Sequence, residues 1–265
     1  MKNTKLLLTV LIAGSLLTAC HTNNVSKDTT LPEKNPTVKS DSTSKSKKSS
    51  SVKDVTKESS SVEEMNSLAK QSKSTEEIYA TGDIVVGENG DVKPGIYDLE
   101  ITGGSGNIFG NRKNHLMLFI NWLGGAPGTS VDYPSKIRII LFEGDSLELK
   151  SISKVKFTAV PAQVQMTNEL GIGEYVVGRD IKAGTYKLTT NVKMDPQFDN
   201  LGWTVDIYNI STKKTKEQTL TPGNQDVVVK LEDGDIISTS LYNTDQDVPS
   251  DDARLIFTEY KKINN

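Results

Sequence analysis

The chain has 265 residues, of which 35% are hydrophobic and 6% aromatic, and its formal net charge is −3. Residues 1–75 hold 12 lysines and seven acidic residues, which leaves 19 basic and 27 acidic residues, a charge of −8, in the rest of the chain. An acidic body behind a mildly basic N-terminal segment argues against a nucleic-acid-binding protein, which needs a basic face to displace counterions.

The N-terminus predicts a secretory signal peptide over residues 1–19. Residues 1–5 are basic, and residues 6–17 form an apolar run of about 12 residues. A helix that spans a bilayer needs about 20 apolar residues, so this run is too short to cross. It has the proportions of a signal-peptide core.

The apolar run ends in Leu17-Thr18-Ala19-Cys20, which resembles the lipobox of bacterial prolipoproteins. The resemblance implies cleavage between Ala19 and Cys20 and attachment of diacylglycerol to the Cys20 sulfur. Its acyl chains, such as palmitate, would hold the protein on the extracytoplasmic face of the cell membrane. The alternative is an ordinary secretory signal with a chance cysteine. Cys20 is the only cysteine in the chain, which excludes an intramolecular disulfide.

Residues 20–75 are predicted to form the lipidated cysteine and a disordered tether. The segment is rich in Ser, Lys and Thr and has no aromatic residue, so it cannot bury enough surface to offset the entropy lost on ordering. A flexible chain of this length reaches about 40 Å. Near its end Ser61 and Glu64 form a capping-box pattern, and apolar residues recur every three positions from Val62, so a short helix there is an alternative.

The remainder carries one pattern twice. Two landmarks recur at offsets of 89 and 90 residues: residues 82–99 match residues 173–188, and residues 137–145 match residues 227–235. This period is longer than the repeats of solenoids or propeller blades. We therefore predict two duplicated modules, over residues 76–160 and 168–265.

Glycines at equivalent places in the two copies predict turns. Pro94-Gly95 and Ala183-Gly184 occupy the central positions of a turn whose second residue needs positive φ, which is typical of type II turns. Glu143-Gly144 and Asp233-Gly234 lie between apolar runs and predict two-residue hairpin turns.

Apolar and polar residues alternate with period two beside these turns, and no helical period is evident after residue 75. The predicted strands include residues 97–101, 137–141, 155–159, 186–188, 227–231 and 254–260. The predicted fold class is all-β, with two tandem antiparallel β-sandwich modules of jelly-roll type, or else two small open barrels. The junction at residues 160–171 is short, so the modules are expected to touch.

The pattern Tyr-x-Val-Gly-x-Asp-Ile-x-Ala-Gly-x-Tyr-x-Leu at residues 175–188, followed by Leu-x-x-Gly-Asp at residues 231–235, resembles a known β-rich repeat. That repeat occurs in uncharacterised lipoproteins and secreted proteins of low-GC Gram-positive bacteria. The resemblance covers most of residues 80–260. It implies a location and a fold, and it implies no activity.

The sequence offers few residues for enzyme chemistry. The chain has two histidines, His21 in the tether and His115 beside an apolar run, too few to complete a zinc site without a free cysteine. A Ser-His-Asp triad would have to use His115, but no nucleophile-elbow motif accompanies it. We expect no catalytic centre, no metal and no cofactor.

Three polar segments have a structural and a functional interpretation. Residues 103–107 are glycine-rich but lack the Lys-Ser/Thr ending of a phosphate loop, so a turn or bulge is expected. Asp233 and Asp235 could form an acid/base pair, but their place at a turn explains them without catalysis. Asp245 and Asp247 lie in an acidic loop that could bind Ca²⁺, although it lacks EF-hand spacing.

Residues 116–123 are apolar on both faces of a predicted strand, unlike their counterpart at residues 203–208. Either the outer face packs on the second module, which we favour, or it presents an apolar surface to a partner. In the second case Phe119, Trp122 and Trp203 are candidate binding residues for a glycan, although both tryptophans would also suit a core.

The sequence as a whole predicts a non-enzymatic, lipid-anchored protein of the cell surface. Its modules would bind a cell-wall glycan, a peptide or another envelope protein. Two other classes stay open. An envelope hydrolase or carbohydrate-active protein needs catalytic groups that the sequence does not supply. A structural or immunity-type lipoprotein would act by blocking a partner.

Overall fold

The computed structural model describes residues 55–116, 118–129, 132–244 and 247–261, and for residues 55–60 it describes the backbone only. The predicted signal peptide, Cys20, His21 and most of the predicted tether lie outside the described residues. Among the described residues the regular elements are strands and one helix, which confirms the all-β fold class.

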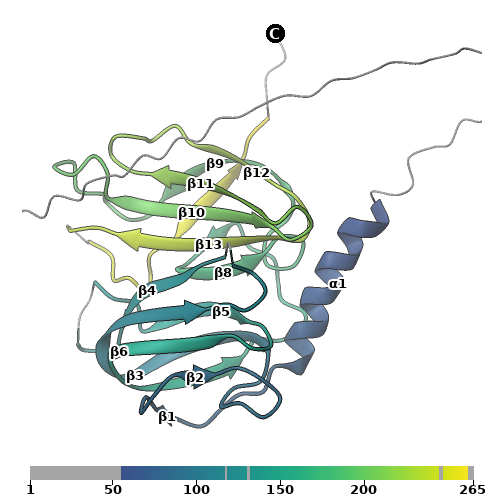
Figure 1. Cartoon of the computed structure of the whole chain (residues 1–265). Coiled ribbons are helices and arrows are strands. Elements are labelled where there is room, and N and C mark those ends of the chain that lie inside the picture. The colour runs from purple at the N-terminus through teal and green to yellow at the C-terminus, as the bar shows by residue number, and fades with distance from the viewer. Residues whose placement is uncertain (1–54, 117, 130–131, 245–246, 262–265) are drawn as a thin grey trace, which may run out of the picture. The chain divides into compact units, whose positions relative to one another are not determined.

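The strands form a ten-stranded and a four-stranded sheet (Figure 1). The larger sheet contains β1 Ile78–Tyr79, β2 Ile84–Val85, β3 Gly95–Asn111, β4 Ile120–Gly125, β5 Lys136–Leu141, β6 Ser146–Ala159, β8 Gly173–Val176, β10 Gly202–Asn209, β11 Lys214–Leu220 and β13 Asp235–Tyr242. Its order is β1-β6-β3-β5-β8-β13-β10-β11, with β2 on β6 and β4 on β3. The smaller sheet runs in the order β12 Val228–Leu231, β9 Gly184–Thr190, β14 Leu255–Glu259 and β7 Glu169–Leu170.

The larger sheet continues from the first predicted module into the second where β5 lies beside β8. This contact is parallel and pairs Arg138 with Gly173. Gly173 has φ +130°, and a Cβ there would lie 2.3 Å from the carbonyl oxygen of Arg138. Only glycine permits so close an approach. The parts of the described chain that correspond to the two predicted modules, residues 76–160 and 168–265, are called the first and second halves. Because strands of both halves share one sheet, the division into two tandem modules stays a prediction.

The two halves repeat the same local contacts around a buried tyrosine. The hydroxyls of Tyr97 and Tyr186 each donate to the carbonyl four residues earlier, at 2.9 and 2.8 Å. Their rings pack edge-on against Phe157 and Phe257, with centroids 5.8 and 5.9 Å apart. The repeated segments therefore have the same local structure, as their matching sequences lead one to expect.

An aspartate in each copy also has the same role. The carboxylates of Asp91 and Asp180 accept the backbone N–H of Val85 and Val176, at 2.9 and 2.8 Å. The Asp of the repeated pattern thus closes the loop that follows β2 or β8. The recurrence of this aspartate in both copies therefore has a structural reason.

The predicted hairpin turns at Gly144 and Gly234 are turns but not hairpins. Both glycines have φ +85°, and hydrogen bonds of 3.1 and 3.0 Å close the turns. A glycine with positive φ at the third position fits a type II turn, which splays the flanking strands instead of pairing them. Accordingly, β3 lies between β5 and β6, and β12 and β13 belong to different sheets.

The type II turns predicted at Gly95 and Gly184 are wrong. Neither glycine is among the described residues with positive φ, and each is the first residue of a strand. A Cβ on Gly95 would lie 2.8 Å from the ring of Tyr97, and one on Gly184 would lie 3.1 Å from the ring of Tyr186. These glycines leave room for the tyrosine two residues later.

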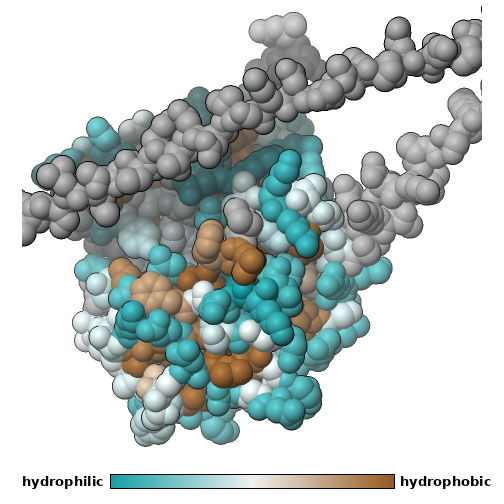
Figure 2. Space-filling model, in the orientation of Figure 1, coloured by the Kyte–Doolittle hydropathy of each residue, from teal (hydrophilic) through white to brown (hydrophobic). Residues whose placement is uncertain are grey.

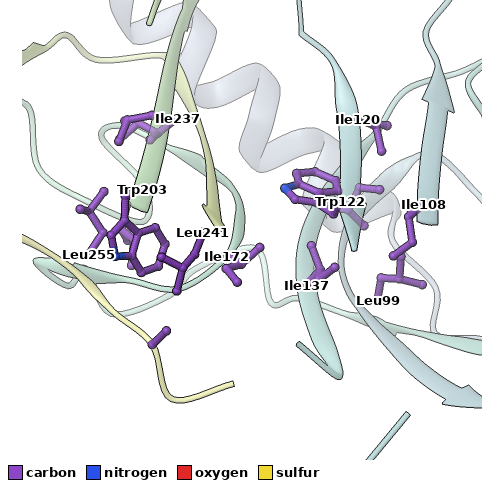
Figure 3. Close-up of a cluster of buried hydrophobic side chains, with 14 of the residues drawn as sticks. Leu99, Ile108, Ile120, Trp122, Ile137, Ile172, Trp203, Ile237, Leu241 and Leu255 are labelled. Carbon is purple, nitrogen blue, oxygen red and sulfur yellow. The ribbon is translucent and has the colours of Figure 1, made fainter. Parts of the chain in front are cut away.

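One hydrophobic core runs through both halves. It includes residues of β3, β4, β5 and β6 together with residues of β9, β10, β13 and β14. Figure 3 shows Trp122 in one group of aliphatic side chains and Trp203 in another, with Ile172, directly before β8, between the two groups. The expectation that the halves touch is thus met by a shared core.

Both tryptophans are core residues, and neither belongs to an exposed binding surface. Trp122 is 3% exposed and Trp203 is 0% exposed. Their indole N–H groups are satisfied internally, by the Thr239 carbonyl at 3.1 Å and the Thr190 hydroxyl at 2.8 Å. This corrects the candidate glycan surface for these two residues.

The helix α1, Val55–Gln71, packs against the strands (Figure 1). Its residues Ser61, Met65 and Ala69 are buried at a spacing of four, which is the stripe expected of a helix that packs by one face. Met65 and Ala69 lie in a second hydrophobic cluster with residues of β3, β5, β8, β10 and β13. The helix is not long and apolar enough to span a membrane.

The predicted disordered tether therefore ends earlier than residue 75. Residues 61–71 pack on the body as a helix, and the segment after it is tied to β3 and β6. Ser72 Oγ accepts the N–H of Ile96 at 2.8 Å, and Thr75 N–H donates to the Phe157 carbonyl at 2.9 Å. The suggested helix exists, but Ser61 is inside it and not at its N-cap.

Candidate functional site

A groove of about 610 Å³ lies where β5, β7 and β8 meet the junction segment and the loop before β14. Small-molecule sites have volumes of roughly 300–1,000 Å³. Most of the side chains in its walls are polar or charged, and they come from both halves of the chain. The residues that line it include Arg138, Glu169, Gly171, Tyr175, Asp180 and Arg254.

Arg138 on β5 is held in place by acids on two sides. Its Nε donates to Oδ1 of Asp98 on β3 at 2.6 Å, and its Nη1 lies 3.4 Å from Oδ1 of Asp180. Burial acts to lower the pKa of Arg138, but the hydrogen bond and the charge of Asp98 raise it above its usual value. Arg138 and its two acids therefore form a charge network in the groove wall, and Arg179, which also donates to Asp180 Oδ1, extends it.

The carboxylate of Asp251 is also occupied within the protein. It accepts the Ser135 N–H at 2.7 Å, the Ser135 hydroxyl at 2.6 Å and the Lys136 N–H at 3.2 Å. These bonds tie the loop before β14 to the start of β5. Asp251 shapes the groove and has little capacity left for a ligand.

Arg254, directly before β14, keeps a positive charge with no carboxylate partner in the part of the chain that the structure describes. Its Nη1 donates to the carbonyl oxygens of Asp251 at 2.9 Å and Ala253 at 2.7 Å. Carbonyl oxygens orient a guanidinium without neutralising it. They use both N–H groups of Nη1 and leave those of Nε and Nη2. Arg254 is therefore a preoriented cation in the groove.

The Tyr175 hydroxyl and Arg254 converge at Gly171. A Cβ on Gly171 would lie 3.4 Å from Tyr175 Oη and 3.4 Å from Arg254 Nη1. Burial, assisted by the charges of Asp98 and Asp180 and opposed by Arg138 and Arg254, raises the pKa of Tyr175 to about 12. Its hydroxyl therefore stays protonated at neutral pH, and a hydroxyl donor and a cationic group flank a position that has no side chain.

No family model, curated protein or solved structure matches the chain. The chemistry of the groove therefore follows from its own side chains. The Tyr175 hydroxyl and the Arg254 guanidinium at Gly171, a second cation, Arg138, held by acids, and an exposed carboxylate at Glu169 suit the binding of a small charged ligand.

A second charged cluster is buried between the halves and has no access to a ligand. Arg112 donates to Asp145 Oδ2 at 3.1 Å, to Glu174 Oε1 at 2.5 Å and to the Ile140 carbonyl at 2.8 Å. All three charged side chains are at most 3% exposed. Burial raises the pKa of both carboxyls, and the charge of Arg112 opposes that shift. The cluster joins β8 to the loops of the first half.

The apolar run at residues 116–123 is partly packed and partly exposed. Leu118 is buried in the second hydrophobic cluster with residues of β8 and β10, so the favoured packing on the second half is found there. Leu116 and Phe119 are 67% and 69% exposed, and Met117 lies outside the described residues. Figure 2 shows apolar patches on the lower half of the visible face. Of the three predicted binding residues, only Phe119 is exposed.

His115 is a packing residue. Its ring stacks on Phe142 with centroids 4.1 Å apart, and its Nδ1 is 3.5 Å from the Tyr208 hydroxyl. Burial and the charge of Arg112 lower its pKa, which favours the neutral ring. The described residues contain no group of three or more His, Cys, Asp or Glu side chains placed to hold a metal ion.

The other polar segments have structural roles where they are described. Residues 103–107 form a bulged part of β3, as expected. Asp235 is buried and accepts bonds from the Asn209 amide at 2.8 Å and the Glu232 N–H at 2.9 Å, which explains it without catalysis. Asp247 accepts the Lys193 N–H at 3.0 Å, and Asp245 lies outside the described residues.

One carboxyl with a shifted pKa lies elsewhere on the larger sheet. Asp206 on β10 is directly opposite Glu217 on β11. Burial, with the charge of Glu217 adding to it, raises the pKa of Asp206 to about 6. Neither residue lines the groove. A like-charge pair across two strands is sufficient to explain the shift.

The sequence interpretation missed the groove residues. Tyr175 lies inside the repeated pattern, whose tyrosines are predicted to be core residues. Arg138 is predicted to be an outward polar residue of an alternating strand. Arg254 and Glu169 are isolated charges with no motif around them. The one available signal was the short junction at residues 160–171, because ligand sites often form where two halves meet.

Proposed function

We propose that this chain is a lipid-anchored, non-enzymatic binding protein of the cell envelope, attached through Cys20 on the extracytoplasmic face of the membrane. The groove between the halves is its ligand site. The observation that carries the binding proposal is the convergence of the Tyr175 hydroxyl and the Arg254 guanidinium on Gly171, which has no side chain, in a polar groove.

Two further features support a binding role. The polar groups that could serve catalysis, Asp235 and His115, are occupied by contacts with the fold. In the groove the Ser135 hydroxyl donates to Asp251, but that carboxylate also accepts two backbone N–H groups, so the pair is a structural contact between two loops. The other acids that line the groove, except Glu169, bind Arg138, Arg179 or backbone N–H groups. The same features argue against the hydrolase alternative.

Location is argued from the N-terminus alone. Leu17-Thr18-Ala19-Cys20 follows a basic start and a short apolar run, as in prolipoproteins. Two acyl chains on one cysteine give stable membrane attachment, where one chain gives only marginal binding. The segment between Cys20 and α1 would then hold the folded body near the membrane and the wall.

The binding role is tested with the chain lacking its anchor, residues 21–265, so that the packed helix α1 is kept. The labelled protein is added to isolated Gram-positive cell envelopes with increasing unlabelled competitor. Saturable retention that the unlabelled protein displaces is the expected result. Retention that does not saturate, or release of soluble wall fragments over time, would contradict a non-enzymatic binding role.

A further inference from the structure

On the outer face of the smaller sheet, Glu169 lies near Arg254, the groove arginine that has no carboxylate partner among the described residues. Leu170 of β7 pairs with Leu255 of β14, and both are buried. Successive side chains of a strand point to opposite faces, so Glu169, Gly171 and Arg254 share the outward face. In this register Gly171 lies opposite Arg254, and Glu169 is a diagonal neighbour about 7–8 Å away.

Glu169 and Arg254 do not neutralise each other. Arg254 is turned to the carbonyls of Asp251 and Ala253, and no ion pair joins it to Glu169 in the part of the chain that the structure describes. Glu169 is exposed on the groove wall. Gly171 leaves the groove wall opposite the arginine without a side chain. Around it the wall has a hydroxyl donor and a positive charge, and the carboxylate of Glu169 lies two residues away.

We propose that the groove binds a small zwitterion, an amino acid or short peptide with a free carboxylate and a free ammonium group. The ligand carboxylate accepts hydrogen bonds from Arg254 and the Tyr175 hydroxyl beside Gly171, and the ligand ammonium faces Glu169. Arginine suits a carboxylate because its planar N–H groups match the two oxygens. A volume of about 610 Å³ accommodates a peptide of a few residues.

The other charges of the groove fit this assignment. Arg138 is committed to Asp98 and Asp180, and the Asp251 carboxylate to Ser135 and the Lys136 N–H. Lys136 is exposed at the rim, with its Nζ 3.8 Å from Glu100. A ligand with only an anionic group would leave Glu169 unpaired beside it, whereas a zwitterion complements both ends.

The test is an NMR titration of residues 21–265 with trialanine as the probe, beside its N-acetylated and its C-amidated forms. We expect trialanine to shift resonances of groove residues. We expect the amidated form to bind roughly tenfold or more weakly, since a charged hydrogen-bonding partner is lost. The acetylated form should bind more weakly than trialanine as well.

Variants separate the two ends of the site. Arg254→Gln should abolish the preference for trialanine over the amide, and Glu169→Gln should abolish the preference over the acetylated form. Gly171→Ala places a methyl group beside both donors at ordinary contact distance, so it should weaken binding while the fold is kept. Gly82→Ala is its control, because a Cβ at Gly82 would have nothing within 4 Å.

The proposal is overturned if no probe shifts groove resonances, if the three probes bind equally, or if Gly171→Ala binds trialanine as well as Gly82→Ala does. The inference rests on the proposed binding function, but the two fail separately. Saturable retention by cell envelopes together with a negative titration rejects the zwitterion site and keeps the binding function. Loss of both rejects the binding function.

Discussion

Arg112 links the two halves through a buried charge cluster. It reaches Asp145 from the first half and Glu174 from the second, and all three side chains are buried. A buried ion pair adds little stability relative to apolar residues, yet removing one partner leaves an uncompensated charge in the core. Here a single cation compensates two carboxylates.

Replacing Arg112 with Met should lower the free energy of unfolding by about 3–5 kcal/mol at neutral pH. The loss should be smaller at pH 5. Without the cation, the folded-state pKa values of Asp145 and Glu174 rise further above their unfolded values, so stability falls as pH rises through that range. Urea denaturation of residues 21–265 at both pH values measures this.

Lys113→Met is the matched control for this variant. It removes the same charge from an exposed neighbour and should change stability by less than about 0.5 kcal/mol. If Arg112→Met costs no more than Lys113→Met, the buried cluster does not hold the halves together.

Single residues of the groove could not be predicted from the sequence. Alternation identifies Asp98 and Arg138 as outward residues of strands, but only the register of β3 with β5 shows that they pair. Arg254 has no carboxylate partner among the described residues because its guanidinium is turned to two carbonyls of its own loop, which the sequence does not indicate. Burial of Trp122 and Trp203 was one of two open interpretations, because an aromatic residue in an alternating strand suits a core and a surface equally.

At the scale of elements, α1 is the alternative to a disordered tether that the sequence left open, and it is longer than the capping-box pattern indicates. A composition of Ser, Lys and Glu predicts disorder, and the mean hydropathy of residues 55–71 is low. A narrow stripe of Ser61, Met65 and Ala69 nevertheless packs on strands of both halves. Such a stripe is easily missed, since tertiary packing supplies most of the stability of a helix in a protein.

Met65→Ala tests whether α1 belongs to the folded body. Met65 is 2% exposed, and shortening a buried Met to Ala lowers the free energy of unfolding by about 2–5 kcal/mol. Thermal or urea unfolding of residues 21–265 should show this loss. Glu64→Ala, at an exposed position of the same helix, should have almost no effect. Equal stability of the two variants would mean that the helix does not pack on the strands.

The strands were the more predictable elements, and the turns the less predictable. Each predicted strand falls within or overlaps an observed one, because period-two alternation reports a buried face directly. The Gly144 and Gly234 turns were assigned to hairpins from local sequence, whereas pairing of β5 with β3 and β8, and of β12 with β9, depends on distant strands. Local sequence identifies a turn but not the partners of the strands beside it.

At the scale of the whole molecule, the repeat is read correctly as repeated local structure but does not by itself delimit modules. Equivalent hydrogen bonds recur in both halves, while one hydrophobic core and one sheet include strands of both. A period in sequence reports what each copy does locally. The period carries no information on how far the two copies share a core. The groove is lined by residues of both copies, so it depends on their contact.

The central claim, a binding protein held at the membrane by a lipid on Cys20, is tested most directly by fractionating cells that express the full chain or its Cys20→Ala variant. The full chain should be found with the membranes and should carry a diacylglyceryl group on an N-terminal Cys20 by mass spectrometry. Cys20→Ala should leave the membrane fraction. Retention of Cys20→Ala in the membranes, or an unmodified Cys20 in the membrane-bound full chain, would contradict the account.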